Sequence, residues 1–176
     1  MIRKVRSGSF PVFVLATVLL GQVSWQPAKS EERAVTPEMG PVKLADDFSA
    51  GKVAGRDGLV FVKPVLGERW TPAEDETPLE PGDWVKTAAR GANAAELALA
   101  DGSRLIVGPA SLLEVVKAGT ARLHQGEIEV RPAAGAKFEL LGPGGARAEV
   151  DAPRVFRAQE GALTPLEKEP AWLAGF

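Results

Sequence analysis

The pattern of apolar and polar positions is clearest where two short runs meet at a turn. Residues 95–100 place Leu97 and Leu99 two positions apart, and Asp101-Gly102 separates this run from the β-branched run at 104–107. Alternation with a period of two is typical of a strand with one buried face, and Asp-Gly between two such runs indicates a hairpin. The composition of residues 95–100 favours a helix, but the run that follows the turn favours a paired strand.

The same pattern recurs along the chain and predicts about ten strands, spaced roughly 8–12 residues apart, with no periodic segment of helix length. Short strands at this spacing are typical of an all-β domain. We therefore expect an all-β domain over residues 58–165, built as a sandwich or a roll of short, mainly antiparallel strands. The expected strands lie near residues 59–62, 83–88, 95–100, 104–107, 112–116, 120–123, 127–130, 137–141, 146–150 and 154–158, with residues 68–71 as an additional candidate to pair back on the first.

Residues 1–25 differ in pattern, because Arg3, Lys4 and Arg6 precede an apolar run that starts at Phe10. A basic segment before a short apolar run is typical of a secretory signal. The apolar run is shorter than the roughly 20 residues of a spanning helix, but no clean small-x-small cleavage triplet follows it. The sequence predicts one N-terminal hydrophobic helix, either a cleaved signal peptide or an uncleaved membrane anchor, and an exported chain that is periplasmic or faces the periplasm.

Two further segments flank the predicted domain. Residues 26–57 are polar and contain Pro and Gly, which indicates a flexible linker. The Pro-rich, acidic residues 72–81 are expected to form a surface loop. Residues 166–176 carry Trp172, Leu173 and Phe176, a large apolar load for the end of a chain. They are expected either to fold back on the sheet or to begin a following domain.

Composition excludes several functional classes. The chain has a formal net charge of −2, one His and no Cys. A non-specific nucleic-acid binder needs a basic surface, so nucleic acid is not an expected partner. Without Cys, the chain can form neither disulfides nor thiolate metal sites, and one His excludes a multi-histidine metal site within a single chain.

An ordered set of short motifs covers about residues 58–160 and resembles the FecR-like domain. Each motif alone is weak, but their combination and order are fairly specific. The motifs are Gly82-Asp83-Trp84-Val85-Lys86-Thr87, Asp101-Gly102-Ser103, Gly108-Pro109-Ala110-Ser111 and Leu123-His124-Gln125-Gly126-Glu127.

The resemblance implies a β module outside the cytoplasmic membrane, associated with sensing or scaffolding. FecR itself combines a cytoplasmic anti-sigma segment, one membrane span and a periplasmic half that responds to an outer-membrane transporter. The apolar run here begins at Phe10, which leaves no room for the anti-sigma segment, so only the exported module is carried over. The flanking sequence is similar to proteins of planctomycete-like bacteria, in which the module precedes interaction domains of the inter-alpha-trypsin and von Willebrand A types. Downstream domains of a longer chain are therefore implied partners.

Several residues resemble catalytic or binding groups, but turn chemistry explains them better. His124 would need a nucleophile and an orienting acid to act as a base, and neither Ser103 nor Ser111 lies in a nucleophile motif. Asp83 and Asp101 adjoin glycines, where Asp caps turns. Residues 74–76 lack the spacing of a calcium loop, and residues 142–145 lack the lysine of a phosphate loop. No catalytic, metal or cofactor residue is assigned, and no cofactor is expected.

Exposed tryptophans are common at binding surfaces, so Trp70, Trp84 and Trp172 are the candidate partner-binding residues, with core packing as the alternative. The sequence predicts a non-enzymatic envelope protein that senses, signals or scaffolds by binding an envelope protein. The alternatives are a carbohydrate- or peptidoglycan-binding module and, less favoured, an anti-sigma-type transmembrane regulator or a small hydrolase. A long uncovered edge strand would favour a protein partner. Aromatic rings gathered at a groove would favour a glycan, and a pocket joining His124 to an acid and a serine would favour an enzyme.

Overall fold

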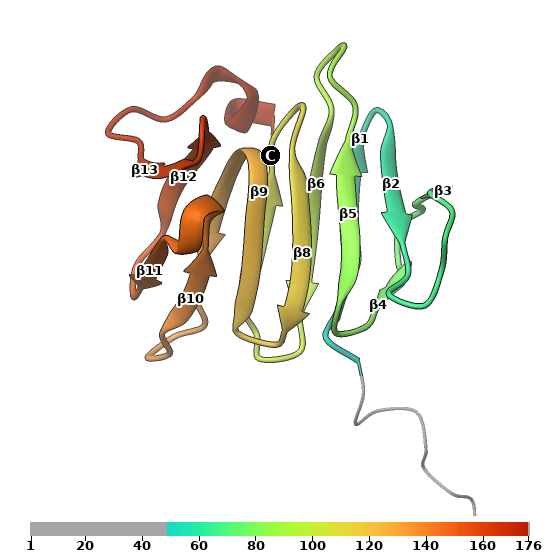
Figure 1. Cartoon of the computed structure of the whole chain (residues 1–176), viewed down its shortest axis with the longest axis horizontal. Helices are drawn as coiled ribbons and strands as arrows, with labels where there is room; N and C mark the ends of the chain where they lie inside the picture. The colour runs from blue at the N-terminus through green and yellow to red at the C-terminus, as the bar shows by residue number, and fades with distance from the viewer. Residues whose placement is uncertain (1–48, 176) are drawn as a thin grey trace, which may run out of the picture. The chain divides into compact units, whose positions relative to one another are not determined.

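The computed structural model describes residues 49–175, which form an all-β domain (Figure 1). Thirteen mostly antiparallel strands make one sheet that curls into a half-barrel. Two short 3₁₀ helices are present, one between two of the later strands and one after the last strand. The elements are β1 Gly51–Asp57, β2 Val60–Lys63, β3 Thr71–Pro72, β4 Pro78–Leu79, β5 Asp83–Thr87, β6 Ala94–Leu99, β7 Arg104–Val107, β8 Leu112–Lys117, β9 Thr120–Arg131, β10 Phe138–Leu141, η1 Pro143–Gly145, β11 Arg147–Val150, β12 Arg154–Gln159, β13 Ala162–Pro165 and η2 Ala171–Gly175.

Strand β9 belongs to both arms of the curled sheet. Its first half pairs with β8 on one side and with β10, in parallel, on the other. Its second half pairs with β7 and β12. The first arm therefore has the order β3-β2-β5-β8-β9-β10-β11, and the second arm has the order β4-β1-β6-β7-β9-β12-β13.

A single hydrophobic core fills the concave side of the curled sheet. The first arm contributes residues such as Val85, Leu113 and Phe138, and the second contributes residues such as Leu97 and Ile128, all fully buried. On strands such as β5 and β8 the core residues alternate with outward-facing ones, as the pleat requires. Burial of these side chains from both arms is the main force that holds the curl closed.

The hairpin predicted around Asp101-Gly102 is confirmed. Strands β6 and β7 pair in antiparallel register, and the amide of Leu99 donates to the carbonyl of Ser103 at 2.9 Å. Gly102 has a φ of 86°, in the left-handed region that glycine adopts without strain. The strand interpretation of residues 95–100 was therefore correct, and the helix-favouring composition was overridden by pairing.

Two predicted boundaries were wrong. Residues 51–57 were assigned to the linker but form β1, whose Val53 is fully buried against the core. Because β1 contains glycines and charged side chains, its sequence shows no clear alternation of apolar and polar residues. Residues 72–81 were predicted as a surface loop, but they contain β4 and two buried residues, Ala73 and Leu79.

The two strands predicted at 120–123 and 127–130 are one continuous strand, β9. Odd-numbered residues such as Leu123 face the core before Gly126, whereas even-numbered residues such as Ile128 face it afterwards. The change of parity coincides with a bulge opposite Leu112 and Leu113, where β9 carries an extra residue. Because the alternation breaks there, the sequence suggests two strands.

The end of the described chain folds back on the second arm, which was one of the two predicted outcomes. Leu173 is 4% exposed and packs with Ile106 and Val155 on the outer side of that arm. Trp172 and Leu166 border the same small cluster. The apolar load of residues 166–175 is therefore used within this domain.

The predicted N-terminal helix at residues 1–25 and most of the predicted linker lie outside the described residues. Within residues 49–175, no helix is long and apolar enough to cross a membrane.

Candidate functional site

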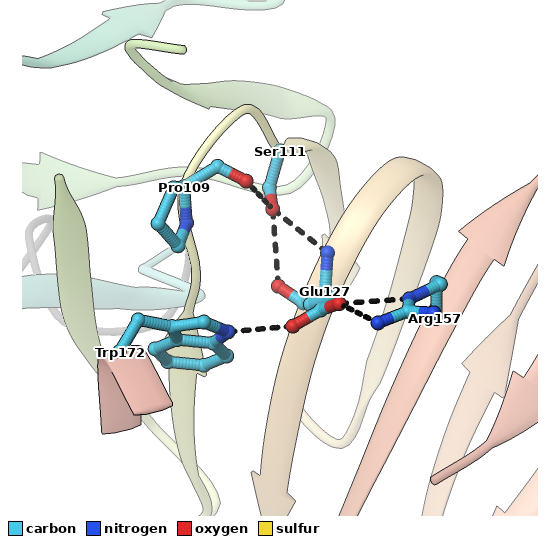
Figure 2. A network of polar contacts seen from close by, with 5 residues as sticks. All are labelled: Pro109, Ser111, Glu127, Arg157 and Trp172. Atoms are coloured by element: carbon cyan, nitrogen blue, oxygen red, sulfur yellow. Dashed lines mark hydrogen bonds and ion pairs between the residues drawn. The ribbon is translucent and has the colours of Figure 1, made fainter. Parts of the chain in front are cut away.

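Residues from three of the sequence motifs meet in one hydrogen-bonded cluster where β9 passes between the arms. The hydroxyl of Thr87 donates to the carbonyl of Gly108 at 2.6 Å and accepts the amide of Ser111 at 3.0 Å. The hydroxyl of Ser111 in turn accepts the amide of Glu127 at 2.9 Å (Figure 2). These side chains satisfy buried backbone groups, which is a structural role.

Glu127 extends this cluster to the C-terminal segment. Its carboxylate accepts the indole N–H of Trp172 at 2.6 Å and the Nε–H of Arg157 at 2.7 Å (Figure 2). The Glu127 side chain is 17% exposed, so these charge-assisted bonds are only partly screened by water. One carboxylate therefore links β9, β12 and η2.

Gly126 is required where β9 bends. Its φ is 93°, and a Cβ added there would lie 2.2 Å from the hydroxyl oxygen and 2.5 Å from the Cα of Ser111. No other residue has both the conformational freedom and the lack of side chain that this contact needs.

Aromatic and cationic side chains gather on the outer face of the first arm. Strand register places Lys63 opposite Trp84 and Phe61 opposite Lys86, all on the face away from the core. The group comprises Phe61, Lys63, Trp70, Trp84, Lys86 and His124, and we call it the aromatic face.

The rings and ammonium groups of the aromatic face contact one another. The Lys63 ammonium lies 5.7 Å from the Trp70 ring centroid and 5.3 Å from that of Trp84. The Lys86 ammonium lies 4.6 Å from the Trp70 ring centroid and 5.4 Å from that of Phe61. Such cation–π contacts hold the rings in place without burying them in the core.

His124 joins the aromatic face at its β9 end. Its ring stacks on Trp84 with centroids 4.4 Å apart and an interplanar angle of 19°. Its Nε2 lies 3.3 Å from a carboxylate oxygen of Glu114, which also accepts a bond of 2.8 Å from Arg122. His124 is the extra residue of the β9 bulge, so the bulge aims it outward beside Gln125.

Two open clefts adjoin the aromatic face. The larger, of about 570 Å³, runs from His124 and Gln125 past Arg157 and Gln159 to Trp172. The smaller, of about 400 Å³, is bordered by residues that include Phe61 and Lys86. Ala110 and Gln125 line both, so the clefts are neighbours.

The three candidate tryptophans therefore lie along one stretch of surface. Trp70 and Trp84 belong to the aromatic face, and Trp172 borders the larger cleft, which His124 connects to Trp84. All three are half-buried, since one part of each ring packs and another part remains accessible.

Apart from His124, the residues considered for catalysis are buried or hydrogen-bonded within the domain. Ser103 and Ser111 are each 1% exposed; Ser103 bonds to Asp101 within its own turn. Asp83 is also buried, and its carboxylate accepts the amides of Val65 and Glu80 at 2.8 and 2.9 Å. Within residues 49–175, the acid beside His124 is Glu114, a residue that the motif search did not consider.

The other two candidate motifs also have structural surroundings. Two of the acidic residues at 74–76 form ion pairs with β1, Glu76 with Lys52 at 2.6 Å and Asp75 with Arg56 at 3.7 Å. Residues 143–145 form the short helix η1, where Gly144 has a φ of 65°. Within the described part of the chain, no three His, Asp or Glu side chains are placed to hold a metal ion.

Sequence reasoning gave no binding role to Phe61, Lys63, Lys86, Glu127 or Arg157, although Lys86 and Glu127 lie within its motifs. Phe61 and Lys86 occupy outward positions of predicted strands and Lys63 directly follows one, so the period-two pattern could have placed them beside Trp84 once the strand order was known. The order β2-β5-β8-β9 is a tertiary property. Arg157 and Trp172 reach Glu127 from 30 and 45 residues away, and no local signal marks such contacts.

Comparison with known proteins adds little to this description. No family model matches the chain, and no curated protein is detectably similar to it. A solved structure described as a "Cell surface anchoring domain" is similar at 25% identity with a TM-score of 0.35, covering 38% of this chain and 84% of that one. A similarity of this extent assigns no function to the chain.

Proposed function

We propose that this chain is a non-enzymatic, exported FecR-like protein whose β domain binds a cell-wall glycan through the aromatic face. The observation that carries the proposal is the gathering of Trp70, Trp84, Phe61 and His124 on one accessible sheet face beside two clefts. Aromatic rings pack on the apolar faces of sugars, and interspersed Lys side chains supply hydrogen bonds to hydroxyl groups.

The edges of the sheet favour a glycan over an added partner strand. Strands β3 and β4, which end the main path of the sheet, have two residues each. Strands β11 and β13, at the other side, have four residues each, and β13 ends at Pro165. Short edges and proline discourage strand addition, so within residues 49–175 the aromatic face is the better candidate surface.

The placement of the protein in the envelope rests on the sequence of residues 1–25. Their basic start and short apolar run are typical of an export signal or an anchor. In that location a glycan-binding domain would hold the chain, and any domain joined to it, against the cell wall.

Truncating the rings tests the proposed binding surface. We expect Trp70→Ala and Trp84→Ala each to weaken binding to purified peptidoglycan sacculi roughly tenfold or more, as is usual for aromatic anchor residues. Binding is measured by cosedimentation of the purified domain with sacculi. Lys52→Ala, on the outer side of β1 and away from the aromatic face, is the control and should bind as the parent does. Equal cosedimentation of the parent and the tryptophan variants, with folding verified by circular dichroism, would refute the proposal.

A second candidate function, binding to an envelope protein, is favoured by one other feature. The turn at residues 64–67 presents Leu66 at 95% exposure and Val65 at 52%. The turn is held firmly, because Gly67 donates to Pro64 at 2.8 Å and Asp83 accepts the amide of Val65. An apolar side chain on a rigid tip is suited to insertion into a partner's pocket.

A photocrosslinking experiment in intact cells distinguishes glycan binding from binding to an envelope protein. If a protein partner docks on the turn, a crosslinker at position 66 should give one discrete adduct that Val65→Ser reduces at least several-fold, as expected for a contact at an interface centre. The readout is the intensity of that adduct on a gel. A crosslinker at position 52 serves as the control. No adduct specific to position 66 would argue against the protein partner and leave glycan binding as the function to test.

A further inference from the structure

The geometry points to the larger cleft, between β9, β12 and η2, as a subsite for one uncharged sugar unit. The inference rests on the proposed glycan-binding function and names a part of the ligand that the aromatic face alone does not select. The inference is based on the residues around an open cleft of about 570 Å³. They include a tryptophan held in a fixed orientation, an arginine paired with a carboxylate, and two amide side chains: Trp172, Arg157, Gln125 and Gln159.

The Trp172 ring is held in a fixed orientation beside this cleft. Part of its ring lies so close to Gly108 that a Cβ there would be 2.6 Å from the indole Cε2. Its N–H is held by Glu127 at 2.6 Å, so the ring cannot rotate freely (Figure 2). The indole also lines the cleft. A ring fixed on one side and accessible on the other binds a flat apolar surface at low entropic cost.

The charges around the cleft favour an uncharged ligand. Arg157 is paired with Glu127 through two N–H groups, so its charge is already compensated. Glu160 is exposed and also lines the cleft, and among residues 49–175 no cation pairs with its carboxylate. A uronic acid or phosphate-bearing sugar would meet this carboxylate with like charge, whereas hydroxyl and acetamido groups would not.

Amide side chains provide hydrogen bonds suited to such a ligand. Gln125 and Gln159 both line the cleft and are exposed. The Gln125 amide makes only a long bond of 3.4 Å to the carbonyl of Ala110, so it can turn to a ligand with little loss. Each amide offers both donors and an acceptor, which matches sugar hydroxyls.

The cleft is continuous with the aromatic face. His124 stacks on Trp84 and lines the cleft, and Gln125 and Ala110 line both the larger and the smaller cleft. A linear glycan that crosses the aromatic face would therefore meet His124 and then the cleft that Trp172 lines. The ligand class that follows is an oligosaccharide of several units, uncharged at the unit beside Trp172.

Titration calorimetry with two soluble probes tests the subsite. The probes are a neutral N-acetylglucosamine oligomer and an oligogalacturonate of the same length. We expect the neutral probe to bind at least tenfold more tightly. Gln159→Ala should weaken its binding about fivefold, and Glu160→Gln should reduce the preference over the anionic probe. Glu149→Gln on β11, away from the cleft, is the matched control and should change neither affinity.

The outcomes separate this inference from the proposed function. If Trp84→Ala weakens binding of the neutral probe but Gln159→Ala and Glu160→Gln leave both affinities unchanged, the subsite is refuted and the aromatic face stands. Equal or tighter binding of the anionic probe would overturn the ligand class. If neither probe nor sacculi bind the parent, both proposals fail. Assigning the Trp172 indole N–H resonance with Trp172→Phe and observing its shift on titration with the neutral probe would support the subsite directly.

Discussion

Replacing Gly126 by alanine is expected to destabilise the domain by about 3 kcal/mol, which sums the cost of a left-handed non-glycine residue and that of overpacking a core contact. The new Cβ would lie 2.2 Å from the Ser111 hydroxyl oxygen, and the backbone φ is 93°. The clash falls on the residue whose hydroxyl accepts the amide of Glu127, so the crossing of β9 between the arms is disturbed directly. Thermal unfolding followed by circular dichroism should show a decrease in Tm of roughly 10 °C.

Gly161→Ala is the matched control for this prediction. Gly161 also has a positive φ, 81°, but an added Cβ would meet nothing within 4 Å. Its variant should therefore lose only the conformational part, about 1 kcal/mol. If the two variants unfolded at the same temperature, the contact between Gly126 and Ser111 would have no special role, and the account of the β9 crossing would be wrong.

Replacing Glu127 by alanine is expected to loosen the C-terminal segment and to cost about 2 kcal/mol, because hydrogen bonds to a charged partner are lost and a half-exposed arginine is left unpaired. The carboxylate holds both Arg157 and the indole N–H of Trp172. Without it, the segment retains the packing of Leu173 and Trp172 and the backbone bond from Leu166 to Val155. We expect faster cleavage within residues 166–175 by a protease, measured by mass spectrometry, together with a lower Tm.

The control for Glu127 is a carboxylate in an exposed ion pair. Glu149 pairs with Lys137 at 2.5 Å, but both side chains are 66% exposed. The hydrogen bond to Glu149 raises the pKa of Lys137. Because water screens this exposed pair, the pair contributes little to the stability of the domain. Glu149→Ala should therefore not measurably change Tm or the cleavage pattern. Protection of residues 166–175 in Glu127→Ala equal to that in the parent would show that the packing of Leu173 alone holds the segment.

Local patterns predicted most strands because the alternation and the turn residues that favour a strand act between near neighbours in the chain. Residues 95–107 combine alternation with a turn dipeptide, and both act over a few residues, so the β6–β7 hairpin could be expected without knowing its neighbours. The alternation of residues 83–87 likewise predicts which positions of β5 face the core. The faces of these strands were thus predictable, whereas their partners in the sheet were not.

Where the alternation is interrupted, sequence reasoning failed for a physical reason. The bulge at His124 and the positive φ of Gly126 reverse which residues of β9 face the core, so a continuous strand looks like two. In β1, the glycines and charges conceal a strand whose stability comes from pairing with β6. Pairing with a strand that is distant in the sequence produces no alternation of apolar and polar residues in either strand.

The candidate site shows the same division. The sequence identified Trp70, Trp84 and Trp172 because tryptophan is a chemically distinctive residue, and it identified the motif around Gly126-Glu127 without a role for it. The contacts of these residues arise from strand order: Lys63 meets two indoles because β2 lies beside β5, and Trp172 meets Glu127 because η2 folds over the second arm.

By itself, the sequence determined the all-β class, most strand positions and faces, the tight turn at Gly102 and the residue types available for binding, since each depends on interactions between near neighbours in the chain. Only the tertiary structure decided the curl of the sheet, the passage of β9 through both arms and the grouping of the aromatic face with its clefts. These features depend on contacts between segments far apart in sequence, whose energies are set by burial and pairing in three dimensions rather than by local pattern.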